Sequence, residues 1–284
     1  RPQTAKTGKI KNSIKTGSYL VSDKVVLCDI DSRGVATVTI NRPEVNNAYN
    51  GDVIAGLLNA LKSLEKENSV RAIILRGNGG HFQAGADLKW INEVAGRSEK
   101  DNIVVSKNTT DVIRFLDYCR IPTVALVHGG CFGGGTGIIA ACDIVIASKD
   151  AFFSISEVRW GLHAGPILPQ LAAAIGTRNL RRYAITGERF GAEKACSLGL
   201  VHEVCPEGGL DLAASPVIES ILRNGPKAIS DTKRIIFEVM DLEIDDILAH
   251  TLATDHARKR RTKEATEGLA SFTEKREAKW YPEN

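Results

Sequence analysis

A run of glycines and one nearby carboxylate are the residues in the middle of this chain that could do chemistry together. The run, Gly133-Gly134-Gly135, follows an apolar stretch expected to be a buried strand (123–127) and precedes a helix of small residues expected over 136–141. Glycines at a helix start leave backbone N–H groups bare and let a ligand approach closely. The helix dipole favours negative charge at that point. Glu157 follows the next predicted strand, 144–147, so an anion-stabilising turn and one acid are expected in one neighbourhood.

A second loop exposes backbone in the same way. Residues 84–87, Ala-Gly-Ala-Asp, follow a strand predicted over 70–75. Strands alternate with helices between 24 and 155, which predicts parallel βαβ units. Open α/β sheets bind ligands at the carboxyl ends of their strands, where both loops would lie. Two converging N–H groups would form an oxyanion hole for the enolate of a thioester; the alternative is two tight turns with only steric requirements.

The elements that must position these loops are predicted from residue periodicity. Two β-rich runs, 24–30 and 34–41, are joined by a hairpin signal, and residues 53–64 carry apolar side chains at helical spacing. Residues 89–101 are polar, and we expect a mobile connection there. Further helices are predicted over 103–116, 168–174, 180–186, 192–198, 213–222 and 227–240 and from residue 244 onward, with an extended segment over 200–204.

Composition excludes several classes of protein. The 284 residues are 43% hydrophobic and 25% charged, which predicts a sizeable core in one large domain, or in one domain with a small appendage. A net charge of +3 is too mild to indicate nucleic acid, and no apolar run approaches the ~18 residues of a membrane span. The six cysteines lack metal-ligand spacing, so we expect no metal site and reduced thiols. The Walker pattern, the dinucleotide-binding fingerprint and the GxSxG elbow are not found.

Several ordered motifs between residues 24 and 280 resemble the crotonase, or enoyl-CoA hydratase/isomerase, superfamily. They are NRPEVNNAYN (41–50), HFQAGADL (81–88), HGGCFGGGTGIIAACDIVIAS (128–148), FSISEVRWGL (153–162), residues 180–190 and EGLASFTEKR (267–276). The resemblance implies an α/β fold, a crotonase-like spiral of ββα units with a helical C-terminal region that forms trimers or dimers of trimers. We expect a flexible N-terminal arm (1–22), a spiral core domain (23–210) and a C-terminal helical oligomerisation region (211–284).

The resemblance also implies the ligand, an acyl-CoA thioester, with no cofactor besides the CoA of the substrate. The backbone N–H groups of Ala86 and Gly134 would hold the thioester oxygen, and Glu157 would be the catalytic acid/base. CoA would lie along one chain's residues and be met by two from a neighbouring subunit. The first group is Val45, Ala48, Ala84, Asp87 and Leu88, and the second is Phe272 and Lys275. The expected location is the cytoplasm, or the mitochondrial matrix in a eukaryote.

Departures from the family pattern bear on the reaction. Hydratases of the superfamily usually carry two glutamates, and the first of them falls on Gly137. Single-acid members include Δ3-Δ2-enoyl-CoA isomerases. The second acid of dienoyl isomerases falls on Gly165 and the dehalogenase aspartate on Ile138, which argues against both. The prediction is a hydratase-type lyase, with a Δ3-Δ2 isomerase as the alternative and an inert or RNA-binding relative as a weaker one.

A second resemblance, to a smaller group within the superfamily, bears on the acyl group of the substrate. Ser-Glu-Val-Arg at 156–159, the glycine at 137 and the 267–276 ending resemble bacterial hydratases of methylglutaconyl- and isohexenylglutaconyl-CoA. Such substrates carry a second carboxylate, which Arg159 or His163 could pair with. Apolar neighbours of Glu157 predict a raised pKa; the alternative is an ion pair with Arg159.

Overall fold

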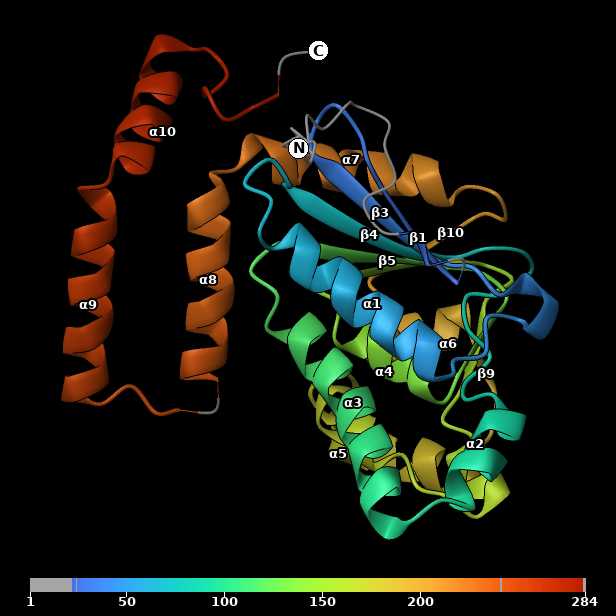
Figure 1. Cartoon of the computed structure of the whole chain (residues 1–284). Helices are drawn as coiled ribbons and strands as arrows, with labels where there is room; N and C mark the ends of the chain where they lie inside the picture. Colours follow the sequence, from blue (N-terminus) through green and yellow to red (C-terminus); the bar gives the residue numbers. More distant parts are fainter. Residues whose placement is uncertain (1–21, 24, 241, 283–284) are drawn as a thin grey trace, which may run out of the picture.

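A seven-stranded sheet in the order β1-β2-β3-β4-β5-β7-β10 forms the centre of the fold (Figure 1). The pairs β1–β2 and β2–β3 are antiparallel, and every following pair is parallel. This confirms the predicted hairpin and the parallel βαβ units. The strands are β1 (Ser22–Asp23), β2 (Val26–Ile30), β3 (Val35–Ile40), β4 (Ala72–Gly77), β5 (Thr123–Val127), β7 (Ile144–Ser148) and β10 (Glu203–Cys205). A second, three-stranded sheet consists of β6 (Gly130–Phe132), β8 (Phe152–Ser154) and β9 (Phe190–Gly191).

The computed structural model of the chain describes residues 22–23, 25–240 and 242–282. The expected N-terminal arm lies almost entirely outside them. The strand predicted over 70–75 is displaced, because Arg71 N–H still bonds the turn carbonyl of Gly34 and pairing with β3 begins only at Val35 and Ala72. The extended segment predicted over 200–204 is likewise displaced towards β10.

Helices cover both faces of the sheet. Helix α1 (Gly51–Leu64) begins at Asn50, whose side chain accepts the N–H of Val53, and it buries its apolar stripe on one face. On the opposite face, α7 (Leu210–Arg223) packs Ile218 and Leu222 into a second apolar cluster with β5 and β7. The other helices of the body are α4 (Gly134–Ala140), α5 (Leu168–Thr186), α6 (Ala192–Leu198) and the 3-10 turns η1 (Pro43–Val45), η2 (Glu157–Trp160) and η3 (Gly165–Ile167).

Two helices near the site differ from the ranges predicted for them. Helix α4 begins at Gly134, two residues before its predicted start, so the glycine run itself supplies its first turn. Helix α5 is broken at Gly176, whose φ of 74° and ψ of 148° are not helical. The two helices predicted over 168–174 and 180–186 are therefore confirmed as two segments of one element.

The prediction of a mobile connection over 89–101 is wrong. Helix α2 (Leu88–Ala95) begins there and α3 (Glu99–Asp117) follows after a short turn. Both starts are capped: the Asp87 carboxylate accepts the N–H of Lys89 and the Ser98 hydroxyl accepts that of Asp101. Only Val94 of α2 is buried, so this helix is fixed by its cap and its neighbours rather than by a wide apolar stripe.

The last three helices stand beside the body rather than on it (Figure 1). They are α8 (Pro226–Val239), α9 (Asp246–Arg260) and α10 (Lys263–Glu274), and none of them contains a buried residue. Polar contacts hold them. Lys233 Nζ lies 2.6 Å from Asp143 Oδ2, and the Glu264 carboxylate accepts the N–H groups of Lys227 and Ala228 at the start of α8.

No helix in the described part of the chain is long and apolar enough to cross a membrane. All six cysteines are free, and five of them are buried. Burial raises the pKa of the Cys28 thiol to about 11, so it stays protonated near neutral pH. The prediction that most of the cysteines are core residues is confirmed.

Candidate active site

A cavity of about 1270 Å³ opens at the carboxyl ends of the central strands. It is larger than the ~300–1,000 Å³ typical of small-molecule sites. Both predicted loops line it, one through Ala86 and the other through Gly134, and Glu157 lines it as well. The sequence predicted that the two loops and Glu157 lie in one neighbourhood. Their shared position on one cavity confirms this prediction.

The N–H groups of Ala86 and Gly134 are free to bind a ligand. Tyr49 N–H donates to Gly85 O and Asp87 N–H donates to Tyr49 O, both at 2.8 Å, which leaves the N–H of Ala86 between them unused. Gly134 lies in the first turn of α4, where helical N–H groups have no partner. Neither N–H has a hydrogen-bond acceptor among residues 25–240 and 242–282.

The glycine run is required by close approach of other side chains. A Cβ atom built on any of the three glycines would come within 3.0 Å of a neighbour, a distance that real Cβ atoms essentially never show. Gly133 also has φ of 48°, which favours glycine. The neighbours are Glu157 Oε1 at 2.9 Å from position 133, Tyr49 Cε1 at 2.6 Å from position 134 and Gln83 Oε1 at 2.6 Å from position 135.

Glu157 is a partly buried acid without an ion pair. Burial raises the pKa of its carboxyl group, although its own backbone N–H opposes the shift. Its Oε2 atom is buried and has no hydrogen-bond partner in the described structure. The Arg159 guanidinium donates instead from Nε to Gly187 O at 3.0 Å, so the alternative of a Glu157–Arg159 ion pair is not what the structure contains. A carboxyl group with a raised pKa can exchange protons near neutral pH.

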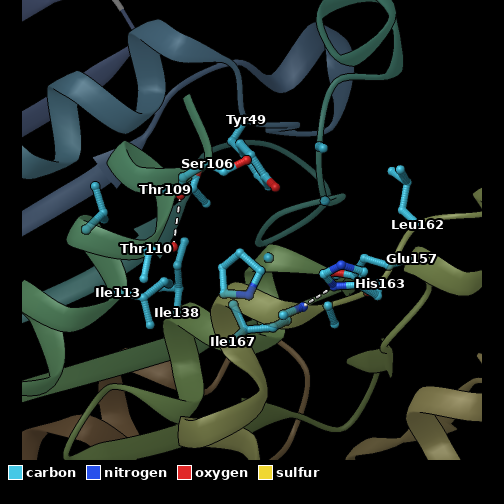
Figure 2. A pocket seen from close by; sticks show the side chains of 18 of the residues that line it. Tyr49, Ser106, Thr109, Thr110, Ile113, Ile138, Glu157, Leu162, His163 and Ile167 are labelled. Atoms are coloured by element: carbon cyan, nitrogen blue, oxygen red, sulfur yellow. Dashed lines mark hydrogen bonds between the residues drawn. The ribbon is translucent and has the colours of Figure 1, made fainter. Parts of the chain in front are cut away.

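The position of the absent first glutamate is filled. A Cβ atom on Gly137 would lie 2.1 Å from Cγ2 of Ile167, which is itself buried. Ile138 also lines the cavity there (Figure 2). Among the described lining residues the other acid is Asp117, at the end of α3, where burial raises its pKa and Gln170 donates a hydrogen bond to it.

A profile of the family described as "Enoyl-CoA hydratase/isomerase" matches residues 31–283. The chain belongs to this family. It is 34% identical over 220 residues to the short-chain-enoyl-CoA hydratase of Clostridium acetobutylicum (76% of this chain, 82% of the relative) and 33% identical over 229 residues to a peroxisomal Delta(3,5)-Delta(2,4)-dienoyl-CoA isomerase of Arabidopsis thaliana (77% and 82%). The crystal structure of an enoyl-CoA hydratase from Shewanella pealeana matches with a TM-score of 0.87 and 34% identity, covering 90% of this chain and 96% of that one. The expected crotonase-like fold is thereby confirmed.

The residues that the family resemblance assigns to CoA fall in two places. Five gather on adjacent loops, because Ala84 N–H donates to Asn46 O and Arg42 donates both to Ala48 O and to the Asp87 carboxylate. They are Val45, Ala48, Ala84, Asp87 and Leu88. The pKa of Asp87 is lowered. Burial acts in the opposite direction, but hydrogen bonds from Arg42 and from two backbone N–H groups of α2 stabilise the ionised carboxylate.

The other two, Phe272 and Lys275, lie on α10 and at its C-terminal cap, far from α2 within the single chain (Figure 1). The Phe272 ring is 86% exposed. The position fits the prediction that they serve a neighbouring subunit, which stays a prediction.

Four residues of this enoyl-CoA hydratase/isomerase site were missed or left open by sequence reasoning. Tyr49, Gln83 and Ile167 occupy the space above the glycines, and no periodicity signals such long-range contacts. His163 lies near Glu157 in Figure 2, and its Nδ1 accepts the N–H of Gly165 at 3.1 Å. A Cβ atom on Gly165 would come within 2.9 Å of the His163 ring.

Proposed function

We propose that the protein is a hydratase-type lyase that adds water to a 2-enoyl-CoA thioester. The observation that carries the proposal is a single partly buried carboxyl group, Glu157, in one cavity with the free N–H groups of Ala86 and Gly134. Two donors aimed at a developing oxyanion are the usual means of stabilising an enolate.

The reaction balances with one carboxylate. Glu157 takes a proton from water while the hydroxyl oxygen bonds to C3 and the electron pair of the double bond moves to the thioester oxygen. The N–H groups of Ala86 and Gly134 hold the enolate oxygen. The Glu157 carboxyl then returns its proton to C2, so water is added across the double bond and the acid is regenerated.

A Δ3-Δ2-enoyl-CoA isomerase is the second candidate, and Gly137 favours it. Because Ile167 fills the space above Gly137, no second acid can stand there to activate water. An isomerase needs only Glu157, which would remove a proton from C2 of a 3-enoyl thioester and deliver it to C4. A dienoyl isomerase is not proposed, since the position implied for its second acid is Gly165, crowded by the His163 ring.

For the acyl group we propose a branched chain that ends in a carboxylate. Arg159 and His163 both line the cavity, and each has a donor for that charge. Its Nδ1 is an acceptor for Gly165 N–H, so the ring proton lies on Nε2, which remains a donor. Arg159 donates to Gly187 O through Nε, so its Nη atoms are the donors that would meet the carboxylate.

The test is a panel of thioesters incubated in heavy-oxygen water with wild-type protein and with Glu157→Gln. The panel contains crotonyl-CoA, 3-hexenoyl-CoA and 3-methylglutaconyl-CoA, and the products are identified by mass spectrometry. The expected result is a labelled hydroxyl in the product that disappears in the variant. A shifted double bond without label would establish the isomerase instead, and turnover that survives in Glu157→Gln would remove Glu157 from the mechanism.

Self-association as a trimer or a dimer of trimers belongs to the same proposal. Large apolar side chains on α9 and α10 are exposed, with Ile247 at 78%, Leu269 at 66% and Phe272 at 86%. Exposed apolar patches of this kind indicate a protein interface. Analytical ultracentrifugation of Phe272→Glu should show dissociation to smaller species, whereas Leu212→Glu, at an 81% exposed site on α7, should keep the wild-type mass.

We infer a reducing compartment, the cytoplasm or the mitochondrial matrix. The support is that all six thiols are free, which is typical of proteins from reducing compartments.

A further inference from the structure

Hydration needs a group that holds the attacking water, and the usual second glutamate is missing. The hydroxyl groups of two cavity-lining threonines on α3 are already engaged. Thr109 Oγ1 donates to Val105 O and Thr110 Oγ1 donates to Ser106 O, as Figure 2 shows for the second pair. Such intrahelical bonds reduce the capacity of these hydroxyls to orient a ligand.

Tyr49 is the lining residue whose position is fixed by the oxyanion loops themselves. Its backbone bonds the residues on both sides of Ala86, and its ring lies directly over the backbone of Gly134. The Trp90 ring contacts it edge-on, with centroids 6.0 Å apart and planes at 69°. The side chain is therefore held in one orientation relative to both free N–H groups.

The Tyr49 hydroxyl is unengaged and faces the cavity. No hydrogen bond joins it to any residue within 25–240 or 242–282. Figure 2 shows the side chain reaching from one wall of the cavity towards its middle, on the side where Glu157 and His163 lie. Burial and then the charge of Glu157 raise the pKa of Tyr49 to about 12, which places the two groups within electrostatic reach and keeps the phenol neutral near pH 7.

We propose that Tyr49 is a further catalytic residue, whose hydroxyl holds the water molecule that Glu157 deprotonates. The inference rests on the proposed hydratase function. A neutral phenol both donates and accepts a hydrogen bond, so it can fix the water beside C3 without competing for its proton. The proton passes from water to Glu157, the oxygen bonds to C3, and Tyr49 stays protonated throughout.

The experiment compares Tyr49→Phe with wild-type protein in two reactions. Hydration of the best thioester of the panel needs Tyr49, whereas exchange of the C2 protons of butanoyl-CoA with deuterium from D2O needs only Glu157 and the two N–H groups. We expect kcat for hydration to fall about 10- to 100-fold, as for loss of one hydrogen bond to a charged or reacting group, while KM and the exchange rate stay unchanged. Tyr183→Phe, at a buried tyrosine on α5 that does not line the cavity, is the matched control and should change neither.

Each other outcome counts against the assignment. Equal hydration by Tyr49→Phe and wild-type protein would overturn the role of Tyr49 alone. A parallel loss of exchange would show that Tyr49 only shapes the oxyanion loops. Absence of hydration by the wild-type protein would overturn the proposed function, and the role of Tyr49 with it.

Discussion

The body of the molecule and its C-terminal helices are stabilised by different means. In the body, β3, β4, β5 and β7 and the helices on both faces bury two apolar clusters. Helices α8, α9 and α10 contain no fully buried residue. Ion pairs such as Lys233 with Asp143 hold them, together with partly exposed apolar contacts such as that of the Phe237 and Tyr118 rings. Apolar packing fixes positions without regard to charge, whereas polar contacts respond to pH and salt.

The difference explains where chemistry is placed. In the body, the side chains of Glu157, Tyr49 and Gln83 fill the space above the glycine run, and Glu157 and Tyr49 also line the cavity. Among the described residues of the C-terminal region, Phe237 on α8 and Met240 just after it contribute to the cavity wall. Substitutions around the cavity of the body should therefore change catalysis, whereas substitutions in the ion pairs of the C-terminal helices should change stability.

The largest effect is expected for Glu157→Gln. Loss of the acid/base should lower kcat about 10³-fold while making the fold more stable at neutral pH. Because the folded state raises the pKa of Glu157 above its ordinary 4.5, its ionisation costs stability as pH rises through that raised pKa, and glutamine removes the cost. Thermal unfolding at pH 4 and pH 8 should show the variant gaining only at pH 8. Glu93→Gln, at an exposed site on α2, is the control; equal gains at both pH values would contradict the argument.

Gly137→Ala should lower the free energy of unfolding by about 2 kcal/mol. Alanine is the better helix former, but its Cβ would meet Ile167 at 2.1 Å, and overpacking a core costs more than helix propensity returns. Gly191→Ala is the matched control, because a Cβ there meets nothing within 4 Å. The free energies of unfolding of both variants are measured by denaturant titration. Similar free energies for the two variants would show that Ile167 moves aside.

Lys233→Met should cost about 2 kcal/mol, because it leaves the Asp143 carboxylate without its cation at the junction of α8 and the sheet. The side chains of Lys233 and Asp143 are 12% and 27% exposed. Lys107→Met removes a comparable pair whose lysine is 67% exposed and should cost less than ~0.5 kcal/mol. If Lys233→Met lost more activity than its loss of folded protein explains, the argument that this ion pair affects only stability would be wrong.

The smallest effect is expected for Glu267→Gln on α10. Hydrogen bonds from Arg276 and from Lys279 N–H lower the pKa of Glu267 to about 2. Its stabilisation is therefore present above pH 4.5 and lost as pH falls towards 2. The Tm difference from wild-type protein should be small at pH 7, smaller in 1 M salt and absent near pH 2. A difference that is unchanged by salt would indicate packing rather than charge.

Local patterns in the sequence predicted most of the elements. The strand over 123–127, the helix over 192–198 and the break within α5 coincide with the structure because each is set by neighbouring residues. The family motifs predicted Ala86, Gly134 and Glu157 as site residues, and all three line one cavity. The helix over 88–95 was missed because it is short: Leu88, Ile91 and Val94 do recur at helical spacing, but over only eight residues.

What the sequence determined by itself is the inventory: one acid, two glycine-rich loops at strand ends and a glycine where a second acid is usual. What only the tertiary structure decided is which side chains fill the space those glycines leave. Ile167 above Gly137 and Tyr49 above Gly134 come from other loops and turns of the fold. Close packing couples residues that are distant in sequence, and no periodicity or local propensity records that coupling.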